Sequence, residues 1–156
     1  MFVEKNYILT ASEVLNKLNV LLMKDGKKKT VRRKVNTALQ NFIKFKNSDV
    51  NIKPDKYTCY LTGMIHQLKP HVETRQVRKG AKYYDVPFPI KENRQLLLAL
   101  RWLARSVRKR PEPGLVNQLK AEFLDLTYRK GYSMRERKAL QKKVSANIIY
   151  SHFRWK

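Results

Sequence analysis

The sequence is poor in cysteine and glycine and has no long apolar run. Its 156 residues include one cysteine, Cys59, so an internal disulfide is impossible and a disulfide-stapled secreted scaffold is excluded. The five glycines lie at least 17 residues apart, which rules out a glycine-rich phosphate loop. The longest apolar run, residues 96–100, is far too short to cross a bilayer, and no membrane partner is expected.

Residue types that carry catalysis are also thinly spread. The three histidines show no metal-ligand spacing with the cysteine or the acids. We interpret Cys59 as a small core residue rather than a nucleophile. Glu122 and Asp125 form the one acidic i, i+3 pair in an expected helix, and we expect this pair to be solvated or to face a basic protein neighbour. The sequence therefore predicts no enzymatic activity, no metal and no cofactor.

What the sequence has in excess is positive charge. Thirty-five Lys and Arg against 12 Asp and Glu give a net charge of +23, while 42% hydrophobic residues indicate a folded domain and not a basic disordered tail. The charge comes in blocks, including +6 over residues 24–34, +5 over 96–110 and +6 over 127–143. Apolar residues at helical spacing interrupt each block, as a solvated tail would not. This pattern predicts a polyanionic partner.

Hydrophobic periodicity predicts a mainly α fold in one domain, residues 1–156. Three helices are expected within residues 12–70 and three more within 92–150, with a β-hairpin at 72–90 between the third and fourth helices. Residues 151–156 are expected to form a C-terminal tail.

The hairpin is predicted from turn and proline positions. Two extended runs meet at Lys79-Gly80, and Pro87 and Pro89 forbid a helix. Because two strands alone are marginally stable in water, we expect a projecting arm that is held by its partner. At least one of the neighbouring Tyr83 and Tyr84 should face back towards the protein.

Capping residues and apolar positions refine two of the helices. Thr30 and Ser133 are expected to cap the second and sixth helices. In the sixth helix we expect Leu140, Val144 and Ile148 to face inward.

Several basic residues are predicted to gather on helix faces, where they could bind phosphates. Projected as a helix, residues 92–110 place leucines and Val107 on one side and Arg101, Arg105 and Arg108 on the other, with Lys109 beside them. Trp102 falls near the edge; we favour a half-buried core residue, with contact to a base or ribose as the alternative.

Four segments, taken in order, resemble one family. They are Asp25-Gly26-Lys27-Lys28, the hairpin with Gly80-Ala81-Lys82-Tyr83-Tyr84-Asp85-Val86-Pro87, Leu98-Ala99-Leu100-Arg101-Trp102-Leu103, and Ala146-Asn147 with Ser151-His152-Phe153-Arg154-Trp155. Each is similar to a motif of small-subunit ribosomal protein number seven.

The resemblance implies a structural constituent of the small ribosomal subunit that binds the 3′ major domain of its rRNA and organises head assembly. It implies that the arm lies near the exit-site tRNA and the mRNA exit channel, and that other head proteins, among them ribosomal protein number eleven, are neighbours. No homo-oligomer is expected. The rRNA contacts carried over from the family motifs are Lys27, Lys28, Arg75, Arg78, Arg101 and Arg105.

The full set of expected contacts adds the remaining basic positions on these elements. The rRNA-binding residues expected are Lys27, Lys28, Lys29, Arg32, Arg33, Arg75, Arg78, Lys79, Lys82, Arg94, Arg101, Trp102, Arg105, Arg108, Lys109, Arg135, Lys138, Lys142 and Arg154. The residues of the arm expected near tRNA and mRNA are Arg78, Lys79, Gly80, Lys82 and Tyr83.

Two other function classes stay open at this point. One is a stand-alone basic RNA- or DNA-binding regulator, and a more remote one is a basic enzyme acting on nucleic acid. The Lys- and Asn-rich composition and the lack of an Arg-rich leader pattern fit a protein encoded within an organelle. The mitochondrial matrix is therefore favoured, with bacterial cytoplasm or a plastid as alternatives.

Overall fold

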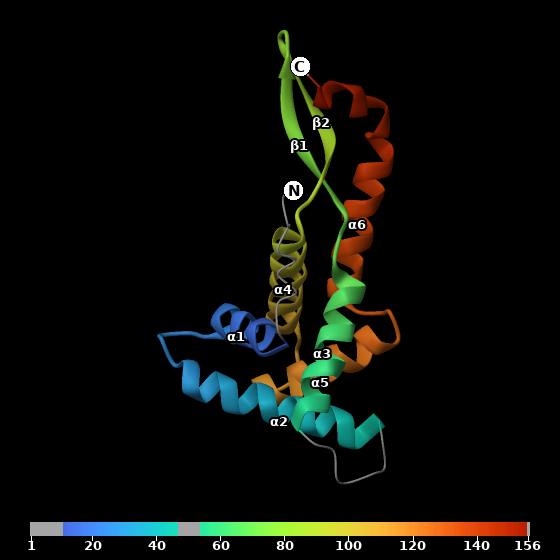
Figure 1. Cartoon of the computed structure of the whole chain (residues 1–156). Coiled ribbons are helices and arrows are strands. Elements are labelled where there is room, and N and C mark those ends of the chain that lie inside the picture. Colours follow the sequence, from blue (N-terminus) through green and yellow to red (C-terminus); the bar gives the residue numbers. More distant parts are fainter. Residues whose placement is uncertain (1–10, 47–53, 156) are drawn as a thin grey trace, which may run out of the picture.

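The computed structural model describes residues 11–46 and 54–155 and is mainly helical (Figure 1). The elements in chain order are α1 (Ala11–Leu22), α2 (Lys28–Lys46), α3 (Pro54–Leu68), β1 (Val72–Lys79), β2 (Lys82–Pro89), α4 (Glu92–Lys109), α5 (Leu115–Thr127), α6 (Tyr132–Ala146) and the 3₁₀ helix η1 (Ile148–Arg154). The predicted six helices with a hairpin between the third and fourth are confirmed for the described residues.

The helices pack around a core of aliphatic and aromatic side chains. Leu18 of α1, Leu100 and Leu103 of α4 and Phe123 of α5 are fully buried in it. The rings of Phe42 and Phe123 meet edge to face, with centroids 6.0 Å apart, and join α2 to α5. The side chain of Cys59, expected in this core, lies outside the described part of the chain.

Both predicted caps are wrong. Helix α2 begins at Lys28, three residues before the start at Val31 that a Thr30 cap implies, so that Thr30 lies inside its first turn. Helix α6 begins at Tyr132 after Gly131, whose φ of +93° suits glycine. The hydroxyl of Ser133 instead donates a hydrogen bond to a buried carboxylate, Glu122, at 2.6 Å.

The C-terminal segment also differs from the expected tail. Helix α6 ends at Ala146, and the chain turns into η1. Leu140 and Val144 are half-buried, but Ile148 is 62% exposed, so its predicted inward position is wrong. The change from an α-helix to a 3₁₀ helix rotates the positions after Ala146 away from the face that the 3.6-residue period predicts.

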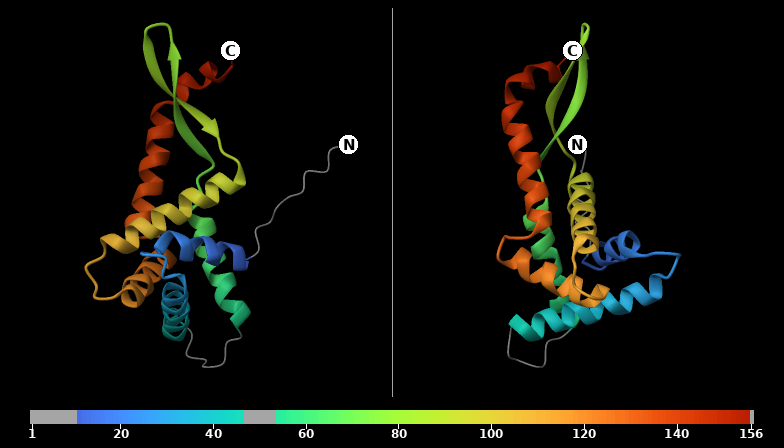
Figure 2. Two further views of the ribbon diagram at one scale, coloured as in Figure 1. Left: turned by 90° about the vertical axis from the view of Figure 1, so that its left-hand side faces the viewer. Right: turned by 180° about the vertical axis from the view of Figure 1, so that it is seen from behind.

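The hairpin extends away from the helical part of the molecule, and η1 lies beside it (Figures 1 and 2). Strands β1 and β2 are antiparallel, and the turn contains Gly80 at φ +63°. The ring of Tyr84 lies 5.0 Å from that of Tyr150 and 5.2 Å from that of Phe153. The chain's own C-terminal segment therefore supports the arm, whereas the sequence predicted support from a partner.

Candidate nucleic-acid interface

The basic stripe predicted on α4 is present. Arg101, Arg105, Arg108 and Lys109 are exposed, whereas Leu100 beneath them is fully buried. The i, i+4, i+7 spacing puts the three guanidinium groups along one side of the helix. We call Arg101, Arg105, Arg108 and Lys109 the α4 stripe.

Contacts within the chain hold part of this stripe in place. Arg105 forms a 3.8 Å ion pair with Glu136 of α6, and Lys109 hydrogen-bonds the hydroxyl of Tyr132 at the start of the same helix. Arg108 donates a 2.6 Å hydrogen bond to the carbonyl of Leu21 in α1. Exposed pairs of this kind contribute little stability, so their charges remain available to a polyanion.

A lysine-rich segment lies against one end of the stripe; it spans residues 24–34 and comprises the loop before α2 and the first two turns of that helix. Lys27, Lys28, Lys29, Arg32 and Arg33 are all exposed. A cavity of about 400 Å³ has four cations and one carboxylate in its lining: Lys24, Lys27, Lys34 and Asp25 from this segment and Arg108 from α4.

Two features of the loop favour anion binding. Its backbone turns through left-handed conformations at Asp25, φ +51°, and Gly26, φ +69°. The exposed N–H groups at the start of α2 add partial positive charge to that of the side chains.

Helix α6 carries a second basic stripe. Arg135, Lys138 and Lys142 are exposed on it, and we call these three residues the α6 stripe. Lys143 is paired instead with Asp85 of β2 at 2.8 Å, which ties the helix to the arm.

The tip of the arm presents a mixed basic and aromatic surface. Arg78 and Lys82 are exposed, and Tyr83 is 66% exposed. Lys79 turns back, its ammonium 5.7 Å from the ring centre of Phe153. The prediction that at least one of Tyr83 and Tyr84 faces back towards the protein is confirmed, because Tyr84 packs against η1 while Tyr83 is exposed.

Three of the predicted contacts have intramolecular roles at the base of the arm. Arg75 and Arg94 both bind the carboxylate of Glu73, at 3.0 and 3.2 Å. Arg154 donates a hydrogen bond to the carbonyl of Pro87 and so connects η1 to β2. Arg75 and Arg94 are exposed, whereas Arg154 is half-buried.

Trp102 is not placed to contact RNA. Only 7% of the residue is exposed, so the indole is packed inside the protein and the stacking alternative is wrong. The helical projection places Trp102 at the edge of the apolar face of α4. In the folded protein, neighbouring elements pack over that edge.

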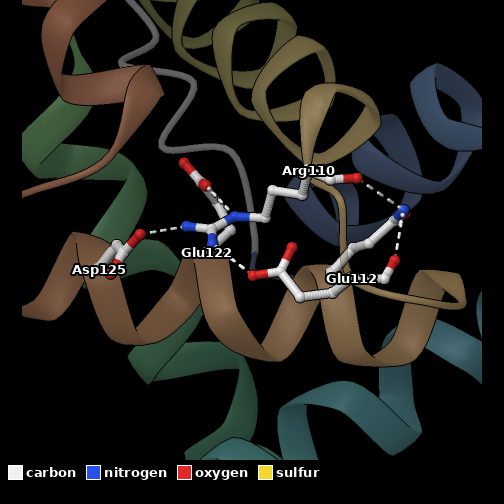
Figure 3. Close-up of polar contacts among 5 residues, drawn as sticks. Arg110, Glu112, Glu122 and Asp125 are labelled. Atoms are coloured by element: carbon white, nitrogen blue, oxygen red, sulfur yellow. Dashed lines mark hydrogen bonds and ion pairs between the residues drawn. The ribbon is translucent and has the colours of Figure 1, made fainter.

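The acidic pair on α5 belongs to an ion network within the chain, in which Glu122 is buried and the side chain of Asp125 is 42% exposed (Figure 3). Arg110, directly after α4, donates a 2.7 Å hydrogen bond to Glu122, which is fully buried, and further hydrogen bonds to Asp125 and Glu112. The expectation of a solvated pair is therefore wrong for Glu122, and the basic partner of both acids is Arg110 of this chain. Ser133 donates to the other oxygen of Glu122, which joins α4, α5 and α6 at one point.

The electrostatics of Arg110 follow from this position. Burial by itself would lower the pKa of its guanidinium, but hydrogen bonds to Asp125 and Glu122 and the charges of these two carboxylates outweigh it, and the pKa is raised. Arg110 is thus a structural cation and is not part of the interface.

Other kinds of site are not found in the described residues. No group of three or more His, Cys, Asp or Glu is placed to hold a metal there. None of the described helices is a candidate membrane span.

Comparison with known proteins gives a consistent result. The profile of the family described as Ribosomal protein S7p/S5e matches residues 3–147. The chain is 36% identical over 146 residues to small ribosomal subunit protein uS7A of Aquifex aeolicus, a match that covers 91% of this chain and 87% of the relative. It is 33% identical over 144 residues to small ribosomal subunit protein uS7 of Vibrio campbellii, covering 92% and 88%.

Proposed function

Because the chain belongs to the ribosomal protein S7p/S5e family, we propose that it binds the 3′ major domain of small-subunit rRNA and organises assembly of the subunit head. Family membership makes the chain a structural component of the small ribosomal subunit and not an enzyme. The observation that carries the rRNA proposal is the distribution of exposed cations over four separate elements: the loop before α2, the α4 stripe, the α6 stripe and the tip of the arm.

This distribution favours folded rRNA over the target of a stand-alone regulator. A regulator reads base edges from one helix placed in a groove, and it needs one basic face for that purpose. Folded rRNA surrounds a small protein and offers phosphates to several faces at once. Cations on the loop, two helices and the arm match the second situation.

The arm is proposed to lie beside the exit-site tRNA and the mRNA exit channel. Its tip exposes Arg78, Lys82 and Tyr83 at the end of the molecule farthest from α2 (Figure 2). A cation can hold a backbone phosphate, and a tyrosine ring can stack on an unpaired base. Other head proteins and ribosomal protein number eleven are the proposed protein neighbours.

The relatives named above are bacterial, and they support a ribosomal location without selecting an organelle. The mitochondrial matrix stays a prediction from composition. Fractionation of the source cells, with the chain followed through purified mitochondria and cytosol, distinguishes the two locations.

Removing two cations of the α4 stripe is expected to weaken RNA binding without unfolding the protein. For Arg101→Ala with Arg105→Ala, the slope of log K against log salt should fall in magnitude by roughly 1.4–1.8, because each lost phosphate contact removes about 0.7–0.9. Filter binding to a transcript of the 3′ major domain between 50 and 200 mM salt measures the slope, because a protein with about 6–10 phosphate contacts loses about 10³–10⁵ in affinity over this range.

A matched variant separates specific placement from total charge. Lys17→Ala with Lys44→Ala removes the same charge from exposed positions on α1 and α2 that are outside the proposed contacts. It should leave the slope nearly unchanged. An equal decrease of the slope in the two double variants would contradict a defined contact between the α4 stripe and RNA.

Deleting the tip of the arm is expected to affect translation more than folding. Without residues 77–82, closed by a short turn, Tyr84 can still pack against Tyr150 and Phe153, so the helical part should keep its Tm and still assemble at least partly. Purified ribosomes with this deletion should show altered exit-site tRNA retention or reading-frame accuracy. Wild-type values in both assays would reduce the arm to a passive extension, and a variant that does not fold would refute a projecting arm.

A further inference from the structure

A second basic pocket lies on the side of α6 that faces α3. Neighbouring residues of α6 point to different helices, since Glu136 pairs with Arg105 of α4 while Arg137 donates a hydrogen bond to the carbonyl of Gln67 in α3. Next to Arg137 is a cavity of about 300 Å³. Its lining residues are His66, Gln67, Lys69, His71, Arg129, Met134 and Arg137.

The ionisable side chains that line this pocket are all basic. Among the described residues that line it there are two arginines, a lysine and two histidines, and no carboxylate. Lys69 is partly neutralised by Glu92 at 3.1 Å, but the carboxylate side chain of Glu92 is 61% exposed and outside the lining. Arg129 and Arg137 therefore leave a net positive pocket, which suits an anion.

Arg129 occupies a backbone conformation that glycine normally takes. Its φ is +55°, in the left-handed region. It is the second residue after α5, in a Schellman-type ending in which the N–H of Arg129 bonds the carbonyl of Leu126 at 3.0 Å and the N–H of Lys130 bonds the carbonyl of Asp125 at 2.8 Å. A side chain at this position costs free energy that glycine would not.

A conformational cost of this kind points to a use for the side chain. The side chain that bears the cost here is a guanidinium at the mouth of a positive pocket. We infer that the pocket between α3 and α6 binds a phosphate group of RNA and that Arg129 is kept at this strained position because it contacts that phosphate. The inference rests on the proposed function and adds a contact face that is separate from the α4 and α6 stripes.

The test compares three variants at one position in the full-length protein. Arg129→Gln removes the charge and keeps the strain; Arg129→Gly removes both; Arg129→Lys keeps both. Binding to a transcript of the 3′ major domain at 0.1 M salt should fall about fivefold for the first two, as expected for one lost phosphate contact, and little for the third. Tm should rise by roughly 2–4 °C for Arg129→Gly alone, because only glycine relieves the strain.

The combination of outcomes decides the inference. Weaker binding by a more stable Arg129→Gly protein supports it, since a merely structural arginine cannot give opposite effects on the two quantities. Unchanged RNA binding by Arg129→Gln and Arg129→Gly, with binding still lost in the Arg101→Ala, Arg105→Ala protein, would overturn the inference and leave the proposed function intact. Wild-type protein that does not bind the transcript at all would instead contradict the proposed function.

Discussion

Replacing Arg110 with methionine is expected to lower the free energy of unfolding by about 3–5 kcal/mol. Methionine fills a similar volume but leaves Glu122, which is fully buried, with Ser133 as the remaining partner seen in this network. A buried carboxylate without a counter-charge costs much more free energy than the original ion pair contributed. Urea unfolding followed by circular dichroism measures the loss.

Two further variants test whether the buried charge is the cause. Arg94→Met breaks an exposed arginine's pair with Glu73 and should cost less than about 1 kcal/mol. Adding Glu122→Gln to Arg110→Met should recover part of the lost stability, because the neutral amide is less costly to bury than a carboxylate. A loss for Arg110→Met as small as that for Arg94→Met would contradict a structural role for the network.

Shortening Leu100 to alanine is expected to cost about 2–5 kcal/mol, because the residue is fully buried in the core between helices and the surrounding side chains cannot fill the space. Affinity for RNA, measured well below the lowered Tm, should stay near wild type. Thermal unfolding and filter binding on the same preparation give both values.

The neighbouring residue provides the matched control. Arg101→Ala changes the next position of α4, on the exposed side, and should leave stability within about 0.5 kcal/mol of wild type while RNA binding weakens. Equal losses of stability in Leu100→Ala and Arg101→Ala would mean that α4 is rotated relative to the described arrangement.

The parts of the fold that were predicted correctly depend on strong local signals. Helix α4 has a continuous apolar side and regularly spaced arginines, so its buried and exposed faces followed from periodicity alone. Proline and glycine fixed the hairpin in the same way, because Pro87 and Pro89 exclude a helix and Gly80 allows the turn. The exposure of the α4 stripe was predicted by the same periodicity.

The features that sequence reasoning missed depend on contacts between distant segments. The partner of the Glu122–Asp125 pair, Arg110, lies outside the helix that carries the two acids, and only the packing of α4 on α5 brings them together. The burial of Trp102 and the support of Tyr84 by η1 are likewise tertiary.

The pocket around Arg129 was missed for a different reason. Its members come from α3 and the residues directly after it, from the turn after α5, and from α6, so that no single stretch of the sequence shows them together. The sequence did contain a signal. Residues 128–130, between the end of α5 and Gly131, include no glycine, although glycine is the usual residue where a left-handed conformation ends a helix. That absence forces an ordinary residue into the left-handed conformation.

Sedimentation of a lysate of the source cells through a sucrose gradient containing magnesium tests the central claim most directly. The account predicts that the chain migrates with small-subunit rRNA and is released to the top of the gradient when the same lysate is treated with ribonuclease. A chain that stays at the top of the untreated gradient, apart from the small subunit, would contradict it.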